Sequence, residues 1–489
     1  MEVVAAAQRE HKQFTPKPGW LEHDPQEIFV NVCECAAAAI RALKDKDSTF
    51  RRLDAVGVTN QRETTVAWDR VSKNVLCPAI VWSDVRTQDS VRRMIDEEGD
   101  ARAFATRCGL PISTYFSATK MRWMLDHIPQ VAHAARGGTL AFGTIDTWLM
   151  WKLSGEQTFV TDVTNASRTM LMNIETRQWD EFLCSRFRIP QTALPEIHSC
   201  SEKLALIRTN EADLRGLLRD DTYICGCIGD QQSALVGNLC FNAGEAKNTY
   251  GTGCFLLANV GDRAKLSRNG LLTTVGYQLG ANARCVYALE GAIAGVGSCV
   301  QWMRDKLEFF DAVSESEKLA RSVESTGGVI FIPAFSGLLA PFWDSAARGT
   351  IVGMTLETSK AHIVRAAFES IAMQVMEVVR AMEDDAQSPF VALKVDGGMA
   401  HNSLVMEIQS DILGIPVDIP HMLETTALGA ALCAGLAVGV WSSEDEILRI
   451  ARKQERIKRV MPFSSPNDRE KKISEWRRGL QRCRGWAHM

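Results

Sequence analysis

Short apolar runs that end in small or polar residues recur along the chain, and they predict strands that alternate with helices. The run Tyr223 to Ile228 is followed by Gly229-Asp230-Gln231-Gln232 and then by a helix-like stretch from Ser233 to Leu239. Leu53 to Thr59 is another apolar run, and it ends in Asn60-Gln61-Arg62-Glu63. Because strands alternating with helices are typical of α/β proteins, the pattern predicts this class.

The rest of the pattern places elements along most of the chain. Helical spacing of apolar residues predicts helices at His362–Met382 and Ser403–Leu413. Asp24 and Pro25 predict a helix start, because aspartate is a common N-cap and proline fits the first helical position. Met1 to Phe14 is predicted to be the end of a strand and its exit. Further strands are predicted at Val66–Trp68, Val75–Trp82, Leu140–Gly143, Val329–Pro333 and Val417–Ile419.

The length and charge of the chain bound its organisation and its partners. At 489 residues it exceeds what one hydrophobic core usually supports, so two domains are expected, at residues 1–238 and 239–489. The net charge of -4 gives no reason to expect nucleic acid or an anionic membrane as a partner. The assembly state is left open between a monomer and a homo-oligomer.

Cysteine usage and the longest apolar stretch bear on the compartment. The 14 cysteines include no Cys-x-x-Cys pair, and most lie in apolar runs, which favours reduced thiols in a core over disulfides or zinc ligands. Ala427 to Trp441 is apolar but shorter than the roughly 20 residues that span a membrane. It predicts a buried helix.

The segment from Asp230 to Phe255 contains the first candidate chemistry. Asp230 stands between a predicted strand and helix, where a carboxylate can face a crevice. The cluster Tyr250-Gly-Thr-Gly-Cys-Phe255 lets backbone N–H groups approach an anion, because glycine has no Cβ. A carboxylate and a phosphate cradle together favour phosphoryl transfer, with Asp230 accepting a proton from the attacking hydroxyl. A turn or helix cap at Gly229-Asp230 is the simpler alternative.

Two other segments stand out, one because it is charged and one because it is rich in glycine. Arg62-Glu63 lies in the turn of a predicted hairpin, where charged residues are usually solvated. The run from Gly291 to Trp302 is rich in glycine at a helix start, where N–H donors could face a phosphate or nucleoside. Small residues that allow close helix packing explain that run equally well.

Several longer motifs together resemble one family. The chain resembles the glycerol kinases of the FGGY carbohydrate kinase family from about Gln8 to about Trp486, with greatest similarity to the trypanosomatid glycosomal type. The motifs are Asn60-Gln-Arg-Glu-Thr-Thr65, Gly143-Thr-Ile-Asp-Thr-Trp148, Thr161-Asp-Val-Thr-Asn-Ala-Ser-Arg168, Gly229-Asp-Gln-Gln232 and Lys247-Asn-Thr-Tyr-Gly-Thr-Gly-Cys-Phe255. Tyr115 to His127 and Gly349 to Glu369 fit the two general signatures of the family.

The resemblance implies a fold, a reaction and a set of site residues. It implies two actin-like, ribonuclease-H-like α/β domains around a central cleft, and ATP-dependent phosphorylation of glycerol with Mg²⁺ and Asp230 as general base. The residues implied to hold glycerol are Arg62, Glu63, Trp82, Tyr115, Asp230, Gln231 and Phe255. Those implied to contact ADP or ATP are Thr252, Gly297, Gln301, Gly398 and Asn402. The ligands of the metal are left unknown.

The chemistry of glycerol agrees with the implied pocket. Its three hydroxyls need charged hydrogen-bond partners, which Arg62 and Glu63 can supply. Its carbons need apolar faces, which Trp82 and Phe255 can provide.

The start of the chain departs from the family pattern. The family begins with a strand and turn of the form Asp-x-Gly-Thr-Thr-Ser, which contacts the phosphates and helps to place the metal, and this motif is absent from the sequence. We expect a truncated chain or a misassigned start, with about 15 to 25 residues missing. Two alternatives to an active glycerol kinase stay open: an inactive relative that binds polyol and nucleotide, and a kinase for another small polyol or sugar.

The last three residues suggest a cellular address. Ala487-His488-Met489 has the small, basic, apolar character of the Ser-Lys-Leu peroxisomal signal. The similarity to glycosomal kinases adds weight to import by a peroxisomal receptor into a peroxisome-like organelle, the glycosome. The cytosol is the alternative.

Overall fold

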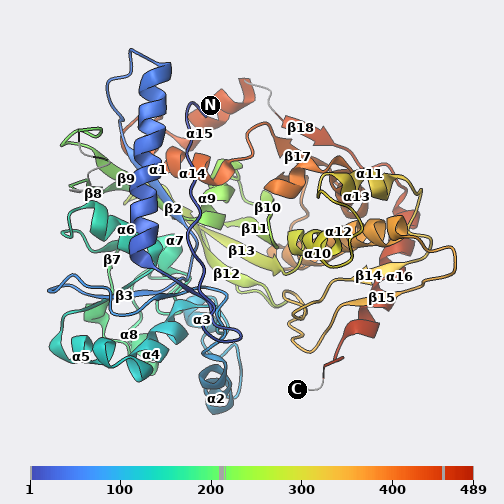
Figure 1. The fold of residues 1–489 in the computed structure, drawn as a ribbon, viewed down its shortest axis with the longest axis horizontal. Coiled ribbons are helices and arrows are strands. Elements are labelled where there is room, and N and C mark those ends of the chain that lie inside the picture. Colours follow the sequence, from blue (N-terminus) through green and yellow to red (C-terminus); the bar gives the residue numbers. More distant parts are fainter. Residues whose placement is uncertain (1–2, 209–213, 215, 454–456, 488–489) are drawn as a thin grey trace. The chain divides into compact units, whose positions relative to one another are not determined.

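The computed structural model describes residues 3–208, 214, 216–453 and 457–487, which form two compact units (Figure 1). The first unit contains residues 1–237, 273–287 and 426–451, and the second contains residues 238–272, 288–425 and 452–489. Two segments from the second half of the chain are therefore grouped with the first unit. The boundary at residues 238 and 239 stays a prediction.

The first unit combines helices with several small sheets. Its helices are α1 (Pro25–Lys46), α2 (Gln88–Glu98), α3 (Ala105–Cys108), α4 (Ser117–His127), α5 (Pro129–Gly137), α6 (Ile145–Leu153), α7 (Val163–Ala166), α8 (Glu181–Arg186), η1 (Gln191–Ala193), α9 (Asp230–Gly237), α14 (Thr425–Ala437) and α15 (Glu444–Lys453). Its strands are β1 (Glu22–His23), β2 (Val56–Asn60), β3 (Val66–Asp69), β4 (Ala79–Ile80), β5 (Leu140–Gly143), β6 (Val160–Asp162), β7 (Glu196–His198), β8 (Ser201–Leu206), β9 (Tyr223–Gly229) and β12 (Leu272–Gln278).

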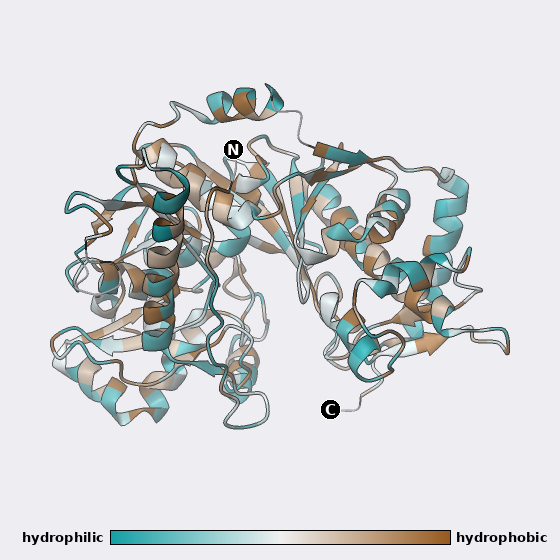
Figure 2. Cartoon of the chain, turned by 45° about the horizontal axis from the view of Figure 1, so that its top comes forward, coloured by the Kyte–Doolittle hydropathy of each residue, from teal (hydrophilic) through white to brown (hydrophobic). Residues whose placement is uncertain are grey.

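Helix α1 begins where the sequence predicts and covers a core of aromatic residues. The Asp24 carboxylate accepts a hydrogen bond from the N–H of Gln26 at 2.8 Å, and Pro25 is the first helical residue. Hydrophobic and hydrophilic residues alternate along α1 (Figure 2), and its apolar side is buried in a cluster with Trp68, Trp148 and Trp151. The rings of Trp68 and Trp148 lie edge to face, 5.4 Å apart.

The sheet β2-β9-β8 carries the polar segments of interest at its end. Strands β2 and β9 are parallel, with Asn60 opposite Gly229, so both strands finish at the same edge. Arg62 and Glu63 follow β2, and Asp230 follows β9 as the first residue of α9. The strand and helix predicted around Asp230 are confirmed, but the turn predicted at residues 229–232 is absent, because α9 begins at Asp230 directly after β9.

Glycines in this sheet allow helix α14 to approach it closely. A Cβ on Gly57 would lie 2.3 Å from the Ala430 carbonyl oxygen, and one on Gly226 would lie 2.8 Å from the same atom. A Cβ on Gly429 would clash with the Ser233 carbonyl oxygen of α9. Because backbones meet at these points, any side chain there would push α14 away from the strand and helix that hold Asp230.

The second unit is built on a mixed sheet in which β13, β11, β10, β16, β17 and β18 lie side by side in that order. Its strands are β10 (Ala246–Tyr250), β11 (Cys254–Gly261), β13 (Cys285–Ile293), β14 (Ile330–Ile332), β15 (Thr350–Val352), β16 (Leu393–Asp396), β17 (Val417–Pro420) and β18 (Ile457–Val460). Its helices are α10 (Gly297–Asp305), α11 (Glu315–Arg321), α12 (Lys360–Ala386), η2 (Gly398–His401), α13 (Ser403–Leu413) and α16 (Pro466–Cys483).

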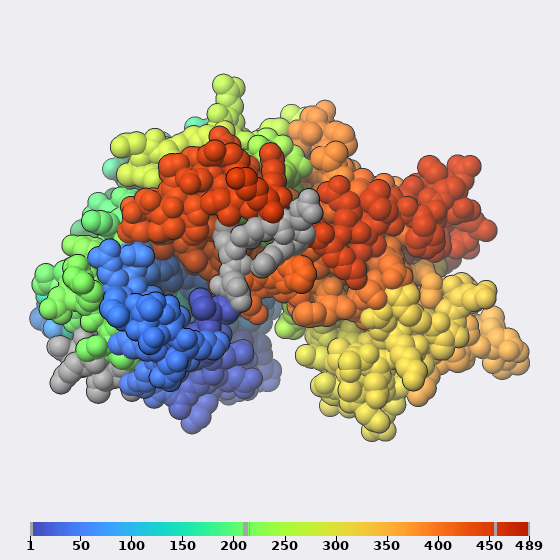
Figure 3. Space-filling view, turned by 90° about the horizontal axis from the view of Figure 1, so that it is seen from above, coloured from blue at the N-terminus to red at the C-terminus, as the bar shows by residue number. Residues whose placement is uncertain are grey.

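The long helix α12 forms the centre of this unit. It packs against α13 and β11, and most of its apolar residues are buried. Tyr250 at the end of β10 donates its hydroxyl proton to Gln409 of α13 at 2.7 Å, and Gln409 in turn donates to the Ala372 carbonyl of α12. The segment around α11, yellow in Figure 3, lies at the surface.

Three details of the sequence-based prediction are wrong. Residues 3–13 form no strand, since the stretch around Glu10 is polar and exposed, and only Phe14 makes an isolated bridge, to Glu22. Of the strand predicted at 75–82, only β4 at residues 79–80 is present, because Pro78 has no N–H group with which to extend the hydrogen bonding of the strand. Strands β2 and β3 form no hairpin, since β2 pairs with β9 and β3 pairs with β5.

Within the part of the chain that the structure describes, no helix has both the length and the apolar character needed to cross a membrane. The stretch predicted as a buried helix at 427–441 corresponds to α14.

Candidate active site

Asp230 and Arg62 form an ion pair at the end of the β2-β9-β8 sheet. Arg62 Nε lies 3.2 Å from Asp230 Oδ1, and Arg62 Nη1 donates to Gln232 Oε1, also at 3.2 Å. The side chain of Arg62 is 2% exposed, whereas that of Asp230 is 33% exposed. A fixed, buried guanidinium therefore orients a carboxylate that a ligand can reach.

Glu63 occupies a strained turn between β2 and β3. Its φ angle is 60°, which is unusual for a residue with a side chain, and the N–H of Thr64 donates to the Arg62 carbonyl at 2.7 Å. The Glu63 carbonyl accepts hydrogen bonds from the hydroxyls of Ser117 at 3.0 Å and Thr65 at 2.9 Å. These bonds hold the strained backbone in place, as is typical of functional sites.

The side chain of Glu63 is buried against Arg168. Arg168 Nε donates to Glu63 Oε1 at 2.6 Å, and both side chains are almost fully buried. The Arg168 guanidinium also lies 5.4 Å from the ring centre of Tyr115 and 5.3 Å from that of Phe116. The simple expectation of a solvated Arg62-Glu63 turn is thus wrong, because both side chains are inside the unit.

Trp82 and Tyr115 lie together near this turn. Their ring centres are 5.4 Å apart at a tilt of 56°. Lys120 fixes the backbone before α4, since its ammonium donates to the carbonyls of Thr114 at 2.6 Å and Tyr115 at 2.7 Å. Burial lowers the pKa of Lys120 to about 7, against the opposing effect of Glu63. Gln231, the last of the six residues predicted for glycerol in the first unit, is buried in α9.

The second unit contains the other predicted residues. Phe255, predicted to face glycerol, lies in β11, and its carbonyl accepts a hydrogen bond from the Lys247 ammonium at 3.2 Å. Thr252 is exposed in the turn between β10 and β11. Phe255 therefore belongs to the same unit as the residues predicted for the nucleotide, whereas the other six residues predicted for glycerol belong to the first unit.

The start of α10 packs directly on the Thr252 turn. The N–H groups of Val296 and Ser298 donate to the Thr252 carbonyl at 3.0 and 3.2 Å, and that of Gly297 donates to the Gly251 carbonyl at 3.2 Å. A Cβ on Gly297 would lie 2.5 Å from that same carbonyl oxygen. Of the two interpretations of this glycine-rich run, close packing is therefore the one that the structure favours at Gly297.

The remaining nucleotide candidates lie on nearby helices of the same unit. Gln301 is exposed and follows Gly297 by four residues, which places both on one side of α10. Gly398 is exposed at the start of η2, and a Cβ there would meet no atom within 4 Å. Asn402 caps α13, accepting a hydrogen bond from the N–H of Val405 at 3.1 Å.

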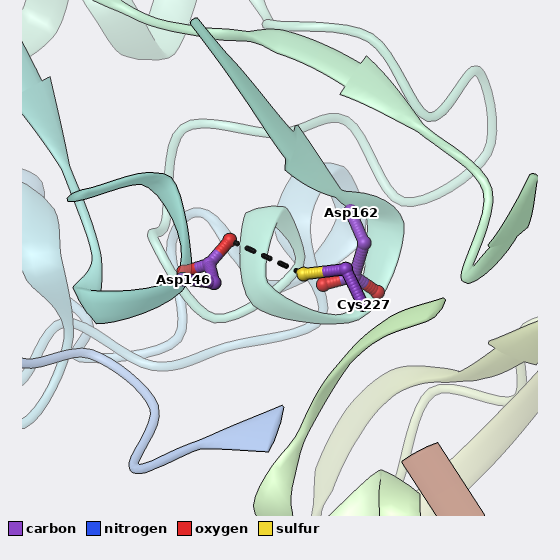
Figure 4. A group of neighbouring side chains, drawn as sticks. All are labelled: Asp146, Asp162 and Cys227. Carbon is purple, nitrogen blue, oxygen red and sulfur yellow. Dashed lines mark hydrogen bonds between the residues drawn. The ribbon is translucent and has the colours of Figure 1, made fainter. Parts of the chain in front are cut away.

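One group of metal-ligand types occurs in the described residues, and its chemistry does not fit Mg²⁺. Figure 4 shows Asp146, Asp162 and Cys227, with the thiol of Cys227 directed at the Asp146 carboxylate. All three are buried, and hydroxyl, amide and thiol donors already occupy the carboxylate oxygens. Burial, and to a lesser extent the negative charge of Asp162, raises the pKa of Asp146 to about 6. Mg²⁺ prefers oxygen ligands and retains several waters, which this closed, thiol-containing group cannot provide.

Sequence reasoning missed two residues that build the site. Arg168 holds Glu63, and Lys120 holds the backbone at Tyr115. Both lie inside motifs of the family, but a sequence motif does not reveal which of its side chains are buried. The signal available was an arginine at the end of Thr161 to Arg168 and a lysine in the middle of Tyr115 to His127.

Comparison with known proteins confirms the resemblance to the FGGY family, while greatest similarity to the trypanosomatid type stays a prediction. The N-terminal domain of the FGGY family of carbohydrate kinases matches residues 1–237, and the C-terminal domain of that family matches residues 246–438. A glycerol kinase from Acidiphilium cryptum (strain JF-5) is 48% identical over an alignment 489 residues long, which covers 99% of this chain and 95% of that protein. A glycerol kinase from Saccharopolyspora erythraea is also 48% identical, with the same coverage of both proteins.

Solved structures confirm the two-domain α/β fold. The structure of Plasmodium falciparum glycerol kinase with ADP has a TM-score of 0.90 at 40% identity and covers 97% of this chain and 92% of that chain. A gluconate kinase from Lactobacillus acidophilus has a TM-score of 0.83 at 21% identity, covering 97% and 91%, and this likeness concerns the fold alone. The chain belongs to the FGGY family of carbohydrate kinases.

Proposed function

We propose that the chain is a glycerol kinase, which transfers the γ-phosphoryl group of ATP to glycerol and forms sn-glycerol 3-phosphate in glycerol catabolism. Two relatives at 48% identity bear the name glycerol kinase, and so does the Plasmodium protein whose structure contains ADP. The observation in this structure that carries the proposal is the ion pair of Arg62 and Asp230, in which a buried cation holds an accessible carboxylate.

The residues around this pair supply what glycerol requires. Arg62 donates hydrogen bonds, Glu63 accepts them, and Gln231 can do both. The rings of Trp82 and Tyr115 offer apolar faces for the carbon atoms, and Phe255 is the candidate from the second unit. We assign these six residues and Asp230 to glycerol.

Asp230 acts as the general base in this proposal. Its carboxylate accepts the proton of a terminal hydroxyl while the hydroxyl oxygen forms a bond to the γ-phosphorus and the bond from that phosphorus to the ADP oxygen breaks. The proton ends on Asp230, and ADP leaves. The Arg62 guanidinium keeps the carboxylate in one orientation.

We assign the nucleotide to the second unit. Thr252, Gly297, Gln301, Gly398 and Asn402 are the proposed contacts, and the exposure of Thr252, Gln301 and Gly398 supports three of them. ATP is proposed to enter as its Mg²⁺ complex, because kinase sites commonly hold this ion through substrate phosphates and one or two carboxylates. The buried Asp146, Asp162 and Cys227 group has no part in it.

A substrate panel tests the proposal. The purified chain is supplied with ATP, Mg²⁺ and glycerol, xylulose or gluconate in turn, and the release of ADP and the phosphorylated product are measured. Glycerol is expected to be the best substrate by kcat/KM. Preference for a sugar would support the second candidate, a kinase for another polyol or sugar, and binding of glycerol without ADP release would support an inactive relative.

The assignment of Gly398 makes a separate prediction. Gly398→Ala should leave the fold intact, because the added methyl group meets open space, and should raise the KM for ATP about tenfold if the nucleotide lies against this backbone. The control for a general effect of the methyl group is Gly137→Ala, at the exposed end of α5 in the first unit, where a Cβ would meet only Thr139 Oγ1 at 4.0 Å. An unchanged KM for ATP would remove Gly398 from the site.

The location and assembly of the protein are proposed on sequence grounds. Ala487 is described, whereas His488 and Met489 of the proposed peroxisomal address lie outside the described residues. Deleting the last three residues from a tagged protein should move it from peroxisome-like organelles, or glycosomes, to the cytosol, and an unchanged distribution would exclude receptor-mediated import through this tripeptide.

Light scattering after size-exclusion chromatography decides between a monomer and a homo-oligomer.

A further inference from the structure

A buried carboxylate lies behind the active-site strands without touching the proposed substrate. Asp162 is the last residue of β6 and the N-cap of α7, with hydrogen bonds from the N–H groups of Thr164 at 2.8 Å and Asn165 at 3.1 Å. Its side chain is fully buried. Two chains of hydrogen bonds lead from this carboxylate to the ends of β9 and β2.

The first chain leads to the residue before Asp230. The hydroxyl of Thr164 donates its proton to Asp162 Oδ2 at 2.6 Å. A hydroxyl has only one proton, so the Thr164 oxygen is left as an acceptor, and the N–H of Gly229 donates to it at 2.9 Å. The carboxylate thus sets the direction of the hydroxyl, and the hydroxyl holds the backbone that leads into Asp230.

The second chain leads to the strand that carries Arg62. Asn165 Nδ2 donates to Asp162 Oδ1 at 2.8 Å. Asn165 and Asn60 exchange two hydrogen bonds through their amides, each 3.0 Å long. Asn60 is the last residue of β2 and lies opposite Gly229, so one carboxylate is connected to both strand ends.

The Gly229 backbone is linked to both members of the ion pair, because it precedes Asp230 in the chain and packs against the side chain of Arg62. A Cβ on Gly229 would lie 2.8 Å from Arg62 Cγ and 2.9 Å from Arg62 Cδ. The stem of the arginine therefore rests on the Gly229 backbone. A shift of Gly229 would move Asp230 through the chain and Arg62 through this contact.

We propose that Thr164, oriented by Asp162, is a positioning residue that fixes the Gly229 backbone and so aims Asp230 for proton transfer. The inference rests on the proposed function of Asp230, and it adds a pair of residues that act through the backbone without touching substrate. A misplacement of about 1 Å in such a group can cost roughly 10²-fold in rate. The network is therefore a determinant of kcat.

Three variants separate positioning from general stability. Thr164→Val keeps the shape of the side chain and removes the hydroxyl, and Thr164→Ser restores it. Thr161→Val is the matched control, because Thr161 is equally buried and its hydroxyl also donates to a buried carboxylate, at 2.7 Å, but that acceptor is Asp146. Each variant is assayed for kcat, for the KM of glycerol, for thermal unfolding and for hydrogen exchange of the peptide that contains Gly229.

The expected result is a loss confined to Thr164→Val. Its kcat should fall about 10- to 100-fold, with the KM for glycerol within about threefold of the parent. Exchange at Gly229 should become about tenfold faster, because its N–H loses its acceptor. Thr164→Ser should recover most of the rate, and Thr161→Val should destabilise the protein to a similar extent while keeping kcat.

Two results would overturn the proposal: parent-like kcat and exchange in Thr164→Val, or equal losses of kcat in Thr164→Val and Thr161→Val. The rates are measured with the panel substrate that the parent chain phosphorylates fastest. A parent that uses another substrate would refute the glycerol assignment, while the ratio of variant rates still decides the positioning role. If the parent phosphorylates none, the exchange at Gly229 decides whether Thr164 holds this backbone.

Discussion

Replacing Asp230 with asparagine is expected to lower kcat about 10²- to 10⁴-fold, because the attacking hydroxyl then keeps its proton. The fold should be preserved, since Asp230 Oδ1 makes the contacts with Arg62 and with the N–H of Gln231, and an amide oxygen can accept both. The KM for glycerol should change far less than kcat. Steady-state kinetics with saturating ATP, together with a thermal unfolding curve, measure both effects.

Asp126→Asn provides the control for this variant. Asp126 also pairs with an arginine, Arg122, one turn earlier in α4, but this pair is on the surface. Exposed ion pairs contribute little, so the change should leave turnover within about twofold of the parent. Near-normal turnover in Asp230→Asn, with Asp126→Asn unchanged as well, would show that the base is another group.

The position of Asp230 could be predicted from sequence because its signals are local. A run of apolar residues ends at Gly229, and a helix begins directly afterwards, so the carboxylate had to stand at a strand end. Helix α13 follows the same rule, since Asn402 caps its start and Gly414 ends it with a φ angle of 73°. Where caps and periodicity agree, the predicted and observed bounds of 403–413 coincide.

The surroundings of Asp230 could not be predicted in this way, because they depend on contacts between distant segments. Thr164 and Gly229 are 65 residues apart, and Glu63 and Arg168 are 105 apart. Charged residues in the turn of a predicted hairpin favour a solvated Arg62-Glu63 turn. It is buried because β2 pairs with β9 instead of β3, which brings the turn against α4 and α7.

The glycines illustrate the same limit. Gly57, Gly226 and Gly429 stand in a strand, a strand and a helix, where glycine is locally unfavourable. Glycine is required at these positions because α14 packs closely against the sheet and against α9. This packing joins residues around 430 to the first half of the chain. The apolar character of α14 was visible in the sequence, whereas the surface that it covers was not.

Arg168→Met is expected to cause the largest loss of stability among the variants considered, about 3–5 kcal/mol of unfolding free energy. The reason is that Glu63 stays buried while the guanidinium that donates to it at 2.6 Å is removed. The KM for glycerol should also rise, because Arg168 lies against Tyr115 and holds the Glu63 turn. Denaturant titration of the purified variant measures the stability, and the coupled kinase assay measures the KM.

The double variant Arg168→Met with Glu63→Gln tests this explanation. If the loss comes from an uncompensated buried carboxylate, making residue 63 neutral should recover part of the stability, so the double variant should be more stable than Arg168→Met alone. Glu63→Gln by itself should be less stable than the parent, because the guanidinium then lacks its anion. A double variant that is no more stable than Arg168→Met would mean that the packing of Arg168 on Tyr115 and Phe116, and not its charge, stabilises the turn.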